Sequence, residues 1–191
     1  GMEIRLDGKV ALVTGSTQGI GRAIAETLAR SGAAGLLVTG REITRGKAVA
    51  TELSQLGTPT VFVAADLADP EAPALLAQAC IERFGRIDAL VNAAGLTDRA
   101  SFLDASLDDW AALFAVNARG TFLMCKHALP SMIARRSGNI VNMASIAGVV
   151  GLRNRAAYCA SKGAVVALTR ALAIDHVGDG VRVNAVAPGP S

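Results

Sequence analysis

A tyrosine and a lysine stand four positions apart in the segment YCASK, residues 158–162. The surrounding residues favour a helix, and side chains four positions apart lie on one face of a helix, so Tyr158 and Lys162 are predicted neighbours. A free tyrosine, with a pKa of about 10, is a poor base at neutral pH, but a nearby ammonium group stabilises the phenolate. The pair can therefore exchange protons. The alternative is an ordinary amphipathic surface pair, although Tyr158 is the only tyrosine in the chain.

Two other polar residues stand where they could assist this pair. Ser145, in NMASIAG, follows a predicted strand over residues 139–144, and Asn117, in FAVNARG, lies in a predicted helix over 106–134. Ligands of open parallel sheets bind at the carboxyl ends of the strands, which is where Ser145 is expected. Taken alone, Ser145 is an ordinary loop or capping serine, and Asn117 is an ordinary polar residue of a helix.

Short apolar runs rich in β-branched residues alternate with longer stretches rich in Ala, Leu, Glu and Arg. The predicted strands cover residues 10–14, 35–39, 60–64, 88–92, 139–144 and 181–186, and the predicted helices cover about 19–31, 43–56, 70–84, 106–134 and 155–177. Continuous apolar strands indicate a sheet covered on both faces, and helical connections imply parallel pairing. The sequence predicts an α/β fold, a doubly wound parallel sheet of the Rossmann type, in a single domain over residues 2–191.

The segment TGSTQGIG, residues 14–21, lies between the first strand and an Ala-rich helix. Gly15 allows a sharp turn, Gly19 lets a phosphate approach the backbone, and Gly21 lets the helix pack close to the sheet. The helix N-terminus offers N–H groups and a positive dipole to an anion. A dinucleotide is the expected ligand, and the alternative is a glycine-rich turn that binds nothing.

With TGSTQGIG, NAAG and YCASK, the chain resembles the short-chain dehydrogenase/reductase family, whose nucleotide-binding signature is Thr-Gly-x-x-x-Gly-x-Gly. The resemblance implies a catalytic set of Asn117, Ser145, Tyr158 and Lys162. Tyr158 would exchange a proton with the substrate oxygen, and Ser145 would polarise the carbonyl. Lys162 would promote ionisation of Tyr158 and bind the nicotinamide ribose, while Asn117 would hold a water that connects Lys162 to solvent.

The resemblance also implies how the cofactor is held. NAAG at 92–95 matches a stretch beside the adenine ribose, with Ala93 where the commonest form has a second Asn, and Asp66 matches a position that holds the adenine amino group. NAVAPG at 184–189 matches the turn that reaches the nicotinamide. The expected cofactor-binding residues are Gly15, Ser16, Thr17, Gly19, Ile20, Gly21, Arg41, Asp66, Leu67, Asn92, Ala93, Gly95, Tyr158, Lys162, Pro188 and Gly189, and no metal site is expected.

The end of the second strand bears on the choice between NADP and NAD. An acidic residue there would bind the ribose hydroxyls of NAD, and a basic residue would pair with the 2′-phosphate of NADP. Gly40 stands where the acid would be, and Arg41 follows it, so NADP is the expected cofactor. Glu42 is acidic and follows Arg41, so NAD is the alternative cofactor. Arg41 could instead be a surface arginine that binds no phosphate.

The composition argues against some classes of binding partner. The net charge is only +3 and the chain has no block of like charges, so it is not expected to bind nucleic acid. The three cysteines form no C-x-x-C pair, and there is no apolar run of membrane-spanning length, so a cytoplasmic protein with reduced thiols is expected. His127 and His176 are expected to have no carboxylate partner.

The resemblance implies a homodimer through the helices at about 106–134 and 155–177. Four apolar residues are expected either in the dimer interface or buried against the sheet, namely Leu113, Phe114, Leu123 and Met124.

The predicted function is hydride transfer between NADP(H) and a small-molecule carbonyl or secondary alcohol. Members of the family usually continue beyond the Pro-Gly turn, so the chain is expected to lack a substrate-covering loop, a helix and the last strand. The alternative is therefore a truncated NAD(P)-binding protein with little or no activity. Epimerisation or dehydration on the same scaffold ranks third, because relatives with those activities usually have a different glycine spacing. No sequence feature identifies the substrate.

Overall fold

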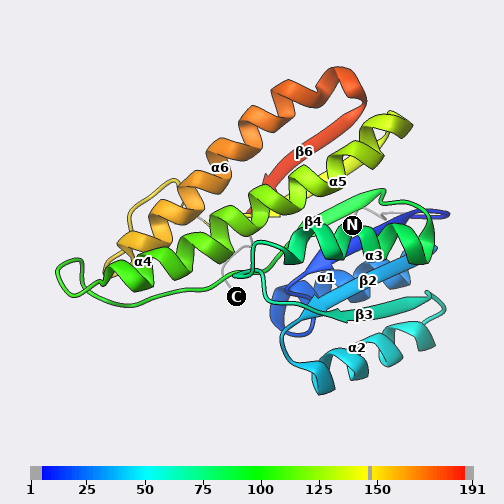
Figure 1. Cartoon of the computed structure of the whole chain (residues 1–191), viewed down its shortest axis with the longest axis horizontal. Helices are drawn as coiled ribbons and strands as arrows, with labels where there is room; N and C mark the ends of the chain where they lie inside the picture. The colour runs from blue at the N-terminus through cyan, green and yellow to red at the C-terminus, as the bar shows by residue number, and fades with distance from the viewer. Residues whose placement is uncertain (1–5, 146–147, 188–191) are drawn as a thin grey trace.

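The computed structural model describes residues 6–145 and 148–187, which form a six-stranded sheet between two layers of helices (Figure 1). The strand order is β3-β2-β1-β4-β5-β6, and each neighbouring pair is parallel. The strands are β1 (Val10–Thr14), β2 (Gly35–Gly40), β3 (Thr60–Ala64), β4 (Ala89–Asn92), β5 (Gly138–Met143) and β6 (Val181–Val186). The predicted doubly wound parallel sheet is confirmed.

The chain builds the sheet outwards from β1 in two directions. β1 pairs on one side with β2 and on the other side with β4. At such a reversal the loops that follow the two central strands run to opposite faces and leave a crevice at the carboxyl ends of the strands. The glycine loop after β1 and the NAAG segment after β4 therefore meet at this edge.

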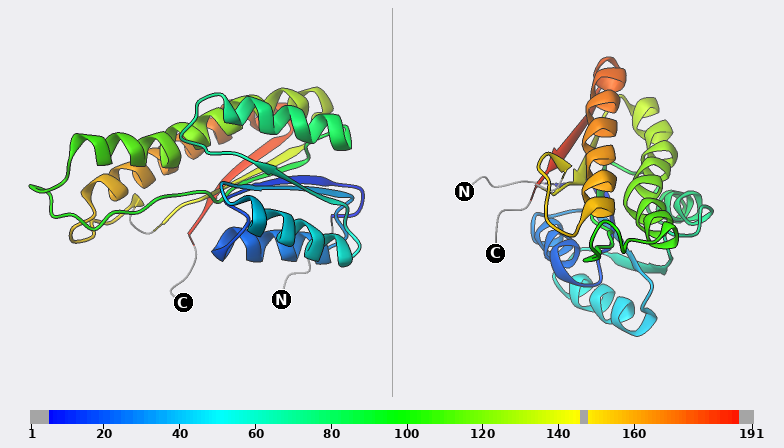
Figure 2. Two further views of the ribbon diagram at one scale, coloured as in Figure 1. Left: turned by 60° about the horizontal axis from the view of Figure 1, so that its bottom comes forward. Right: turned by 90° about the vertical axis from the view of Figure 1, so that its left-hand side faces the viewer.

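Helices cover both faces of the sheet. They are α1 (Gly19–Arg30), α2 (Ile43–Gln55), α3 (Ala72–Phe84), α4 (Leu107–Phe114), α5 (Thr121–Arg135) and α6 (Ala156–His176), with a π-helical turn η1 (Ala115–Gly120) and a short 3-10 helix η3 (Val177–Asp179). Figure 2 shows α1 and α2 on one face and α3, α5 and α6 on the other. The predicted helix over 106–134 is present as α4, η1 and α5, which follow one another without a gap. The π-helical geometry of η1 was not predicted from the sequence.

Successive residues of a strand face opposite layers of the core. Leu12 belongs to the cluster that includes Leu76 of α3, and Val13 belongs to the cluster that includes Leu53 of α2. Leu12 and Val13 are both 0% exposed. The central strands β1 and β2 read as continuous apolar runs because helices cover both of their faces, whereas β6 is exposed at Arg182 and Asn184.

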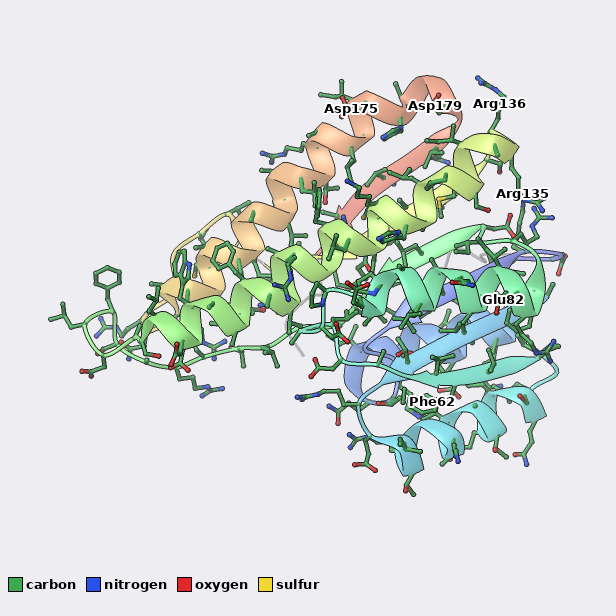
Figure 3. The ribbon with its side chains drawn as sticks, viewed as in Figure 1. Phe62, Glu82, Arg135, Arg136, Asp175 and Asp179 are labelled. Atoms are coloured by element: carbon green, nitrogen blue, oxygen red, sulfur yellow. The ribbon has the colours of Figure 1, made fainter. Side chains whose placement is uncertain are left out.

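A glycine allows α2 to pack closely on the sheet. Phe62 of β3 lies between β3 and α2 (Figure 3), and a Cβ on Gly46 of α2 would overlap its ring. A glycine in a helix interior costs about 1 kcal/mol relative to alanine. The ring of Phe62 fills the space that a side chain at position 46 would need.

The ends of α5 and α6 carry charged side chains at the end of the molecule opposite α4 (Figure 3). Arg136 ends α5 with a φ of 52°, and its Nη2 donates to the carbonyl oxygen of Gly178 at 2.8 Å. The Nδ1 atom of His176 lies 3.0 Å from Oδ2 of Asp179. The prediction that His176 has no carboxylate partner was therefore wrong, because the turn into η3 brings together residues three positions apart.

Within the described residues, one helical segment, Ala156–Asp179, is long and apolar enough to cross a membrane by length and composition. This segment packs along β6 and against α4, and it buries Val165 and Thr169. A helix that covers a sheet can meet the same two criteria, so they are weak evidence for a membrane span.

Candidate active site

The loop after β1 turns sharply and packs against the segment after β4. Gly15 and Gly19 each have a φ of +59°, which residues with a Cβ rarely adopt. A Cβ on Gly15 would lie 2.6 Å from Cα of Ala94, and a Cβ on Gly21 would overlap the carbonyl oxygen of Gly15. Among residues 6–145 and 148–187, no atom lies within 4 Å of a Cβ position on Gly19. The loop is thus tightly packed at Gly15 and Gly21 and open at Gly19, where a ligand can approach.

Ser16 holds the loop in place. Its Oγ donates to the carbonyl oxygen of Val13 at 2.7 Å and accepts from the backbone N–H of Thr39 at 2.9 Å. The residue is 0% exposed. Ser16 was predicted to bind the cofactor, but the structure places its hydroxyl in contact with β1 and β2.

A cleft of about 960 Å³ runs along the carboxyl ends of the central strands. Its volume is at the upper end of the range for small-molecule sites. Most of the predicted cofactor residues line it, namely Gly15, Thr17, Gly19, Ile20, Gly21, Arg41, Asp66, Leu67, Ala93 and Gly95, together with Gln18, Glu42 and Arg45. Predicted residues Pro188 and Gly189 lie outside the described part of the chain.

The cleft fits a ligand that carries phosphates. The N-cap residue of α1, Gln18, makes no side-chain cap hydrogen bond, and the first turn of α1 has no acidic residue. The N–H groups of this helix end are therefore available to an anion. Arg41 and Arg45 also line the cleft, and neither forms an ion pair with another described residue.

Asn117 lies in the π turn and connects two segments of the site. Its Oδ1 accepts from the N–H of Leu96 at 2.7 Å, and its Nδ2 donates to the carbonyl oxygen of Leu96 at 2.8 Å and to Oγ of Ser161 at 3.1 Å. The side chain is 1% exposed. Single π turns often occur at functional sites. Here the turn directs an amide into the space between the loop after β4 and α6.

Lys162 is a buried cation. It is 8% exposed, and its Nζ donates to the carbonyl oxygen of Met143 at 3.3 Å. Burial lowers the pKa of Lys162 below its ordinary value, because the charged form loses solvation. A Cβ on Gly95 would lie 3.5 Å from this Nζ and 3.4 Å from Oδ1 of Asn117. Gly95 thus keeps open a gap of atomic size between Lys162 and Asn117.

Tyr158 and Ser145 complete the predicted set at the same edge of the sheet. Tyr158 is half-buried on α6, with its ring centroid 5.9 Å from Nζ of Lys162. Ser145 stands two residues beyond the end of β5, and its carbonyl oxygen accepts from the N–H of Gly148 at 2.8 Å. Lys162 contacts Met143, the last residue of β5, so α6 and the strand that leads to Ser145 are directly linked.

A chain of buried polar side chains lies behind this set. Nδ2 of Asn92 donates to Oδ1 of Asn142 at 2.9 Å, and Nδ2 of Asn142 donates to Oγ1 of Thr169 at 2.9 Å. All three residues are at most 4% exposed. Asn92 was predicted to bind the cofactor, but its side chain links β4 to β5. This set of hydrogen bonds connects β4, β5 and α6.

A family model described as short chain dehydrogenase matches residues 9–191. The chain belongs to the short-chain dehydrogenase family. It is 44% identical over 187 residues to D-threitol dehydrogenase of Mycolicibacterium smegmatis, an alignment that covers 97% of this chain and 71% of the relative. It is 42% identical to the 3-oxoacyl-(acyl-carrier-protein) reductase FabG of Aquifex aeolicus, with 98% of this chain and 76% of the relative covered.

A solved structure supports the same assignment. A metagenomic short-chain oxidoreductase in complex with NADP superimposes with a TM-score of 0.92 at 36% identity, covering 97% of this chain and 84% of the other. The present chain is therefore a Rossmann-type short-chain dehydrogenase in both sequence and fold.

Sequence reasoning missed three residues of this short-chain dehydrogenase that shape the site. Arg45 lines the cleft one turn after Arg41. Oγ1 of Thr14 accepts from the N–H groups of Ala93 and Ala94 at 3.1 and 3.2 Å. Ser161 contacts Asn117. Thr14 lies in TGSTQGIG and Ser161 lies in YCASK, but only the folded chain shows which groups each side chain contacts.

The cysteines of this short-chain dehydrogenase are all free, and two are buried. Burial raises the pKa of Cys80 to about 12 and that of Cys125 to about 11. A thiol that stays protonated is a weak nucleophile. Cys80 and Cys125 therefore serve as packing residues.

Replacing Gly21 by Ala tests the packing of the nucleotide loop. The new Cβ overlaps the carbonyl oxygen of Gly15, so we expect a loss of about 1–3 kcal/mol in the free energy of unfolding, the usual cost of overpacking. We also expect weaker NADP binding in calorimetric titration. Gly178→Ala is the control, because nothing lies within 4 Å of its Cβ position. Equal stability and NADP affinity in the two variants would contradict this account.

Proposed function

We propose that this short-chain dehydrogenase transfers a hydride between NADP(H) and a carbonyl compound or secondary alcohol. The observation that carries the proposal is the pairing of Tyr158 with the buried ammonium of Lys162 beside the dinucleotide-sized cleft. We assign the hydroxyl of Tyr158 to proton exchange with the substrate oxygen. We assign the Nζ of Lys162, which lies 5.9 Å from the centroid of the tyrosine ring, to binding of the cofactor.

Each residue of the set has a role that its contacts support. When bound, the dinucleotide supplies or accepts the hydride. In the reductive direction Tyr158 donates a proton to the carbonyl oxygen, and Ser145 polarises that oxygen by hydrogen bonding. Met143 is the only acceptor found for Lys162 among the described residues, which leaves N–H donors for the ribose hydroxyls. The gap at Gly95 between Lys162 and Asn117 is suited to the proposed water.

The end of β2 supports NADP as the cofactor. Gly40 offers no carboxylate to ribose hydroxyls, and a Cβ at this position would lie 2.7 Å from Oγ1 of Thr17. Any side chain there would displace Thr17, which lines the cleft. Arg41 and Arg45 lie in the cleft without acidic partners among the described residues and provide two cations for a 2′-phosphate. Glu42 also lines the cleft, so NAD is the alternative to be tested.

The cofactor choice is tested by replacing both arginines. We expect Arg41→Ala with Arg45→Ala to raise the Kd of NADP by about 10- to 100-fold, because contacts with a charged phosphate are lost. The Kd of NAD should change less than about threefold. Both are measured by calorimetric titration, with Lys47→Ala on the same helix as the control for net charge. Tighter binding of NAD than NADP by the unaltered protein would refute the choice.

The catalytic role is tested by Tyr158→Phe, which removes only the hydroxyl. We expect turnover of ketones and secondary alcohols to fall by about 10²- to 10⁴-fold, the usual contribution of a general acid or base, with NADP affinity retained. Unchanged turnover in Tyr158→Phe would refute the assigned role. NADP binding by the unaltered protein without turnover of any carbonyl compound or alcohol would support the alternative of a nucleotide-binding protein.

We further propose that the chain forms a homodimer through α4, α5 and α6. Large apolar side chains are exposed on these helices, including Leu107 at 80%, Phe122 at 46% and Ile174 at 76%. Of the residues predicted for the seam, Leu113 and Met124 are buried in this chain's own core. The available seam therefore differs from the one predicted.

Light scattering with size-exclusion chromatography tests the dimer. Ala171 is exposed on α6, one turn before Ile174, so Ala171→Arg should place a charge in the seam and yield monomers. Ala34→Arg, on an exposed loop before β2, should leave the mass unchanged. A monomeric unaltered protein would rule out the proposal.

A further inference from the structure

Arg155 lies beside the catalytic tyrosine, directly before α6. Its Cζ is 5.9 Å from the centroid of the Tyr158 ring, and its Nη1 lies 3.5 Å from Oγ1 of Thr97 as a donor. Thr97 belongs to the loop between β4 and α4, and Figures 1 and 2 show this loop and the start of α6 at the same end of the molecule. Arg155 therefore stands between two segments that border the reacting group.

The guanidinium of Arg155 has unused donors. It forms no ion pair with any described carboxylate, whereas Arg30 and Arg86 pair with Glu26 and Asp88. Asp98, next to Thr97 in the chain, is not paired with Arg155, and both of its carboxylate oxygens are buried without a hydrogen-bond partner among the described residues. A guanidinium carries five N–H donors, and the contact with Thr97 uses one. An unpaired cation with four open donors beside a proton donor is suited to an anionic ligand.

The surrounding segment strengthens this electrostatic preference. Residues 148–155 contain Arg153 and Arg155 and no acidic residue. Lys162 adds a buried positive charge near Tyr158, with its Nζ 5.9 Å from the ring centroid. Exposed apolar side chains stand in the same segment, with Val149 at 65% and Val150 at 47%. A substrate with a negative group near its carbonyl and a small apolar remainder matches this surface.

We propose that Arg155 binds an anionic group of the substrate, so that the carbonyl compound that reacts at Tyr158 carries a carboxylate or a sulfonate close to its carbonyl carbon. The inference rests on the proposed function, because it names the substrate class of the same site. A guanidinium holds such a group by two parallel hydrogen bonds, which fixes its orientation as well as its position. With the anion at Arg155 and the carbonyl oxygen at Tyr158, the substrate is held at two points.

Three matched ketones test the proposal. 3-Oxobutanoate carries a carboxylate, acetonylsulfonate carries a sulfonate at the same distance from the carbonyl, and methyl 3-oxobutanoate is neutral. We expect kcat/KM for at least one anion to exceed that for the ester by about tenfold or more. Arg155→Gln should lower kcat/KM for that anion by about 10- to 100-fold and change the ester less than about threefold, because the lost contact is charge-assisted. The anion that the unaltered protein prefers identifies the group that Arg155 binds.

Arg153→Gln is the matched control, because it removes the same charge from an exposed position two residues away. This variant should leave the preference for the anion unchanged. Equal use of anion and ester by the unaltered protein would overturn the inference while leaving the proposed oxidoreductase function intact. An equal loss of kcat/KM for the anion and for the ester in Arg155→Gln would also overturn the inference. It would show that Arg155 only stabilises the neighbouring loops.

A binding measurement decides the inference even if no ketone is turned over. Calorimetric titration of the two anions and the ester into the protein saturated with NADP⁺ should show tighter binding of an anion. Arg155→Gln should abolish that difference, and Arg153→Gln should retain it. The absence of turnover would then count against the proposed function alone, whereas equal affinity for anions and ester in the unaltered protein would overturn the inference.

Discussion

The burial of the Lys162 ammonium is the constraint on which the rest of the site depends. A cation that is 8% exposed must be stabilised by oxygen atoms placed around it, because it has lost most of its hydration. The carbonyl oxygen of Met143 supplies one such contact, which requires α6 to lie at a defined depth against the end of β5. Gly95, which lines the cleft, leaves room between the cation and Asn117.

Two further polar links hold α6 at that depth. Asn117 joins the loop after β4 to Ser161, and the chain of Asn92, Asn142 and Thr169 joins β4 and β5 to the next turns of the same helix. Such buried networks are stabilising when their members are satisfied and costly when one member is removed. Helix α6, which carries Tyr158 and Lys162, is therefore tied to the sheet at several points, which suits a site whose side chains must be held in a fixed geometry.

The sequence predicted the fold well because its signals are local. The strand boundaries could be read to within one residue, since each strand is a short apolar run and most of these runs end at Gly, Asn or Asp. The π turn at Ala115–Gly120 could not be read, because the residues of FAVNARG are compatible with an ordinary helix. It forms where Asn117 is bonded to Leu96 and Ser161, which are contacts across large separations in sequence. Ser16 and Asn92 were predicted to bind the cofactor, and the partners that their side chains have in the structure could not be read from the sequence.

The sequence by itself determined the parallel sheet, the glycine turn after β1 and the presence of Tyr158 and Lys162 on one helical face, because these follow from residue type and helix or strand period. Only the tertiary structure decided which polar atoms are satisfied by the protein and which remain for a ligand. Ser16 and Asn92 turned inward to backbone and side-chain partners, whereas Arg41, Arg45 and Arg155 have no acidic partner among the described residues. The physical reason is that a hydrogen bond depends on the position of both partners, and for distant residues that position exists only once the sheet and its helices are assembled.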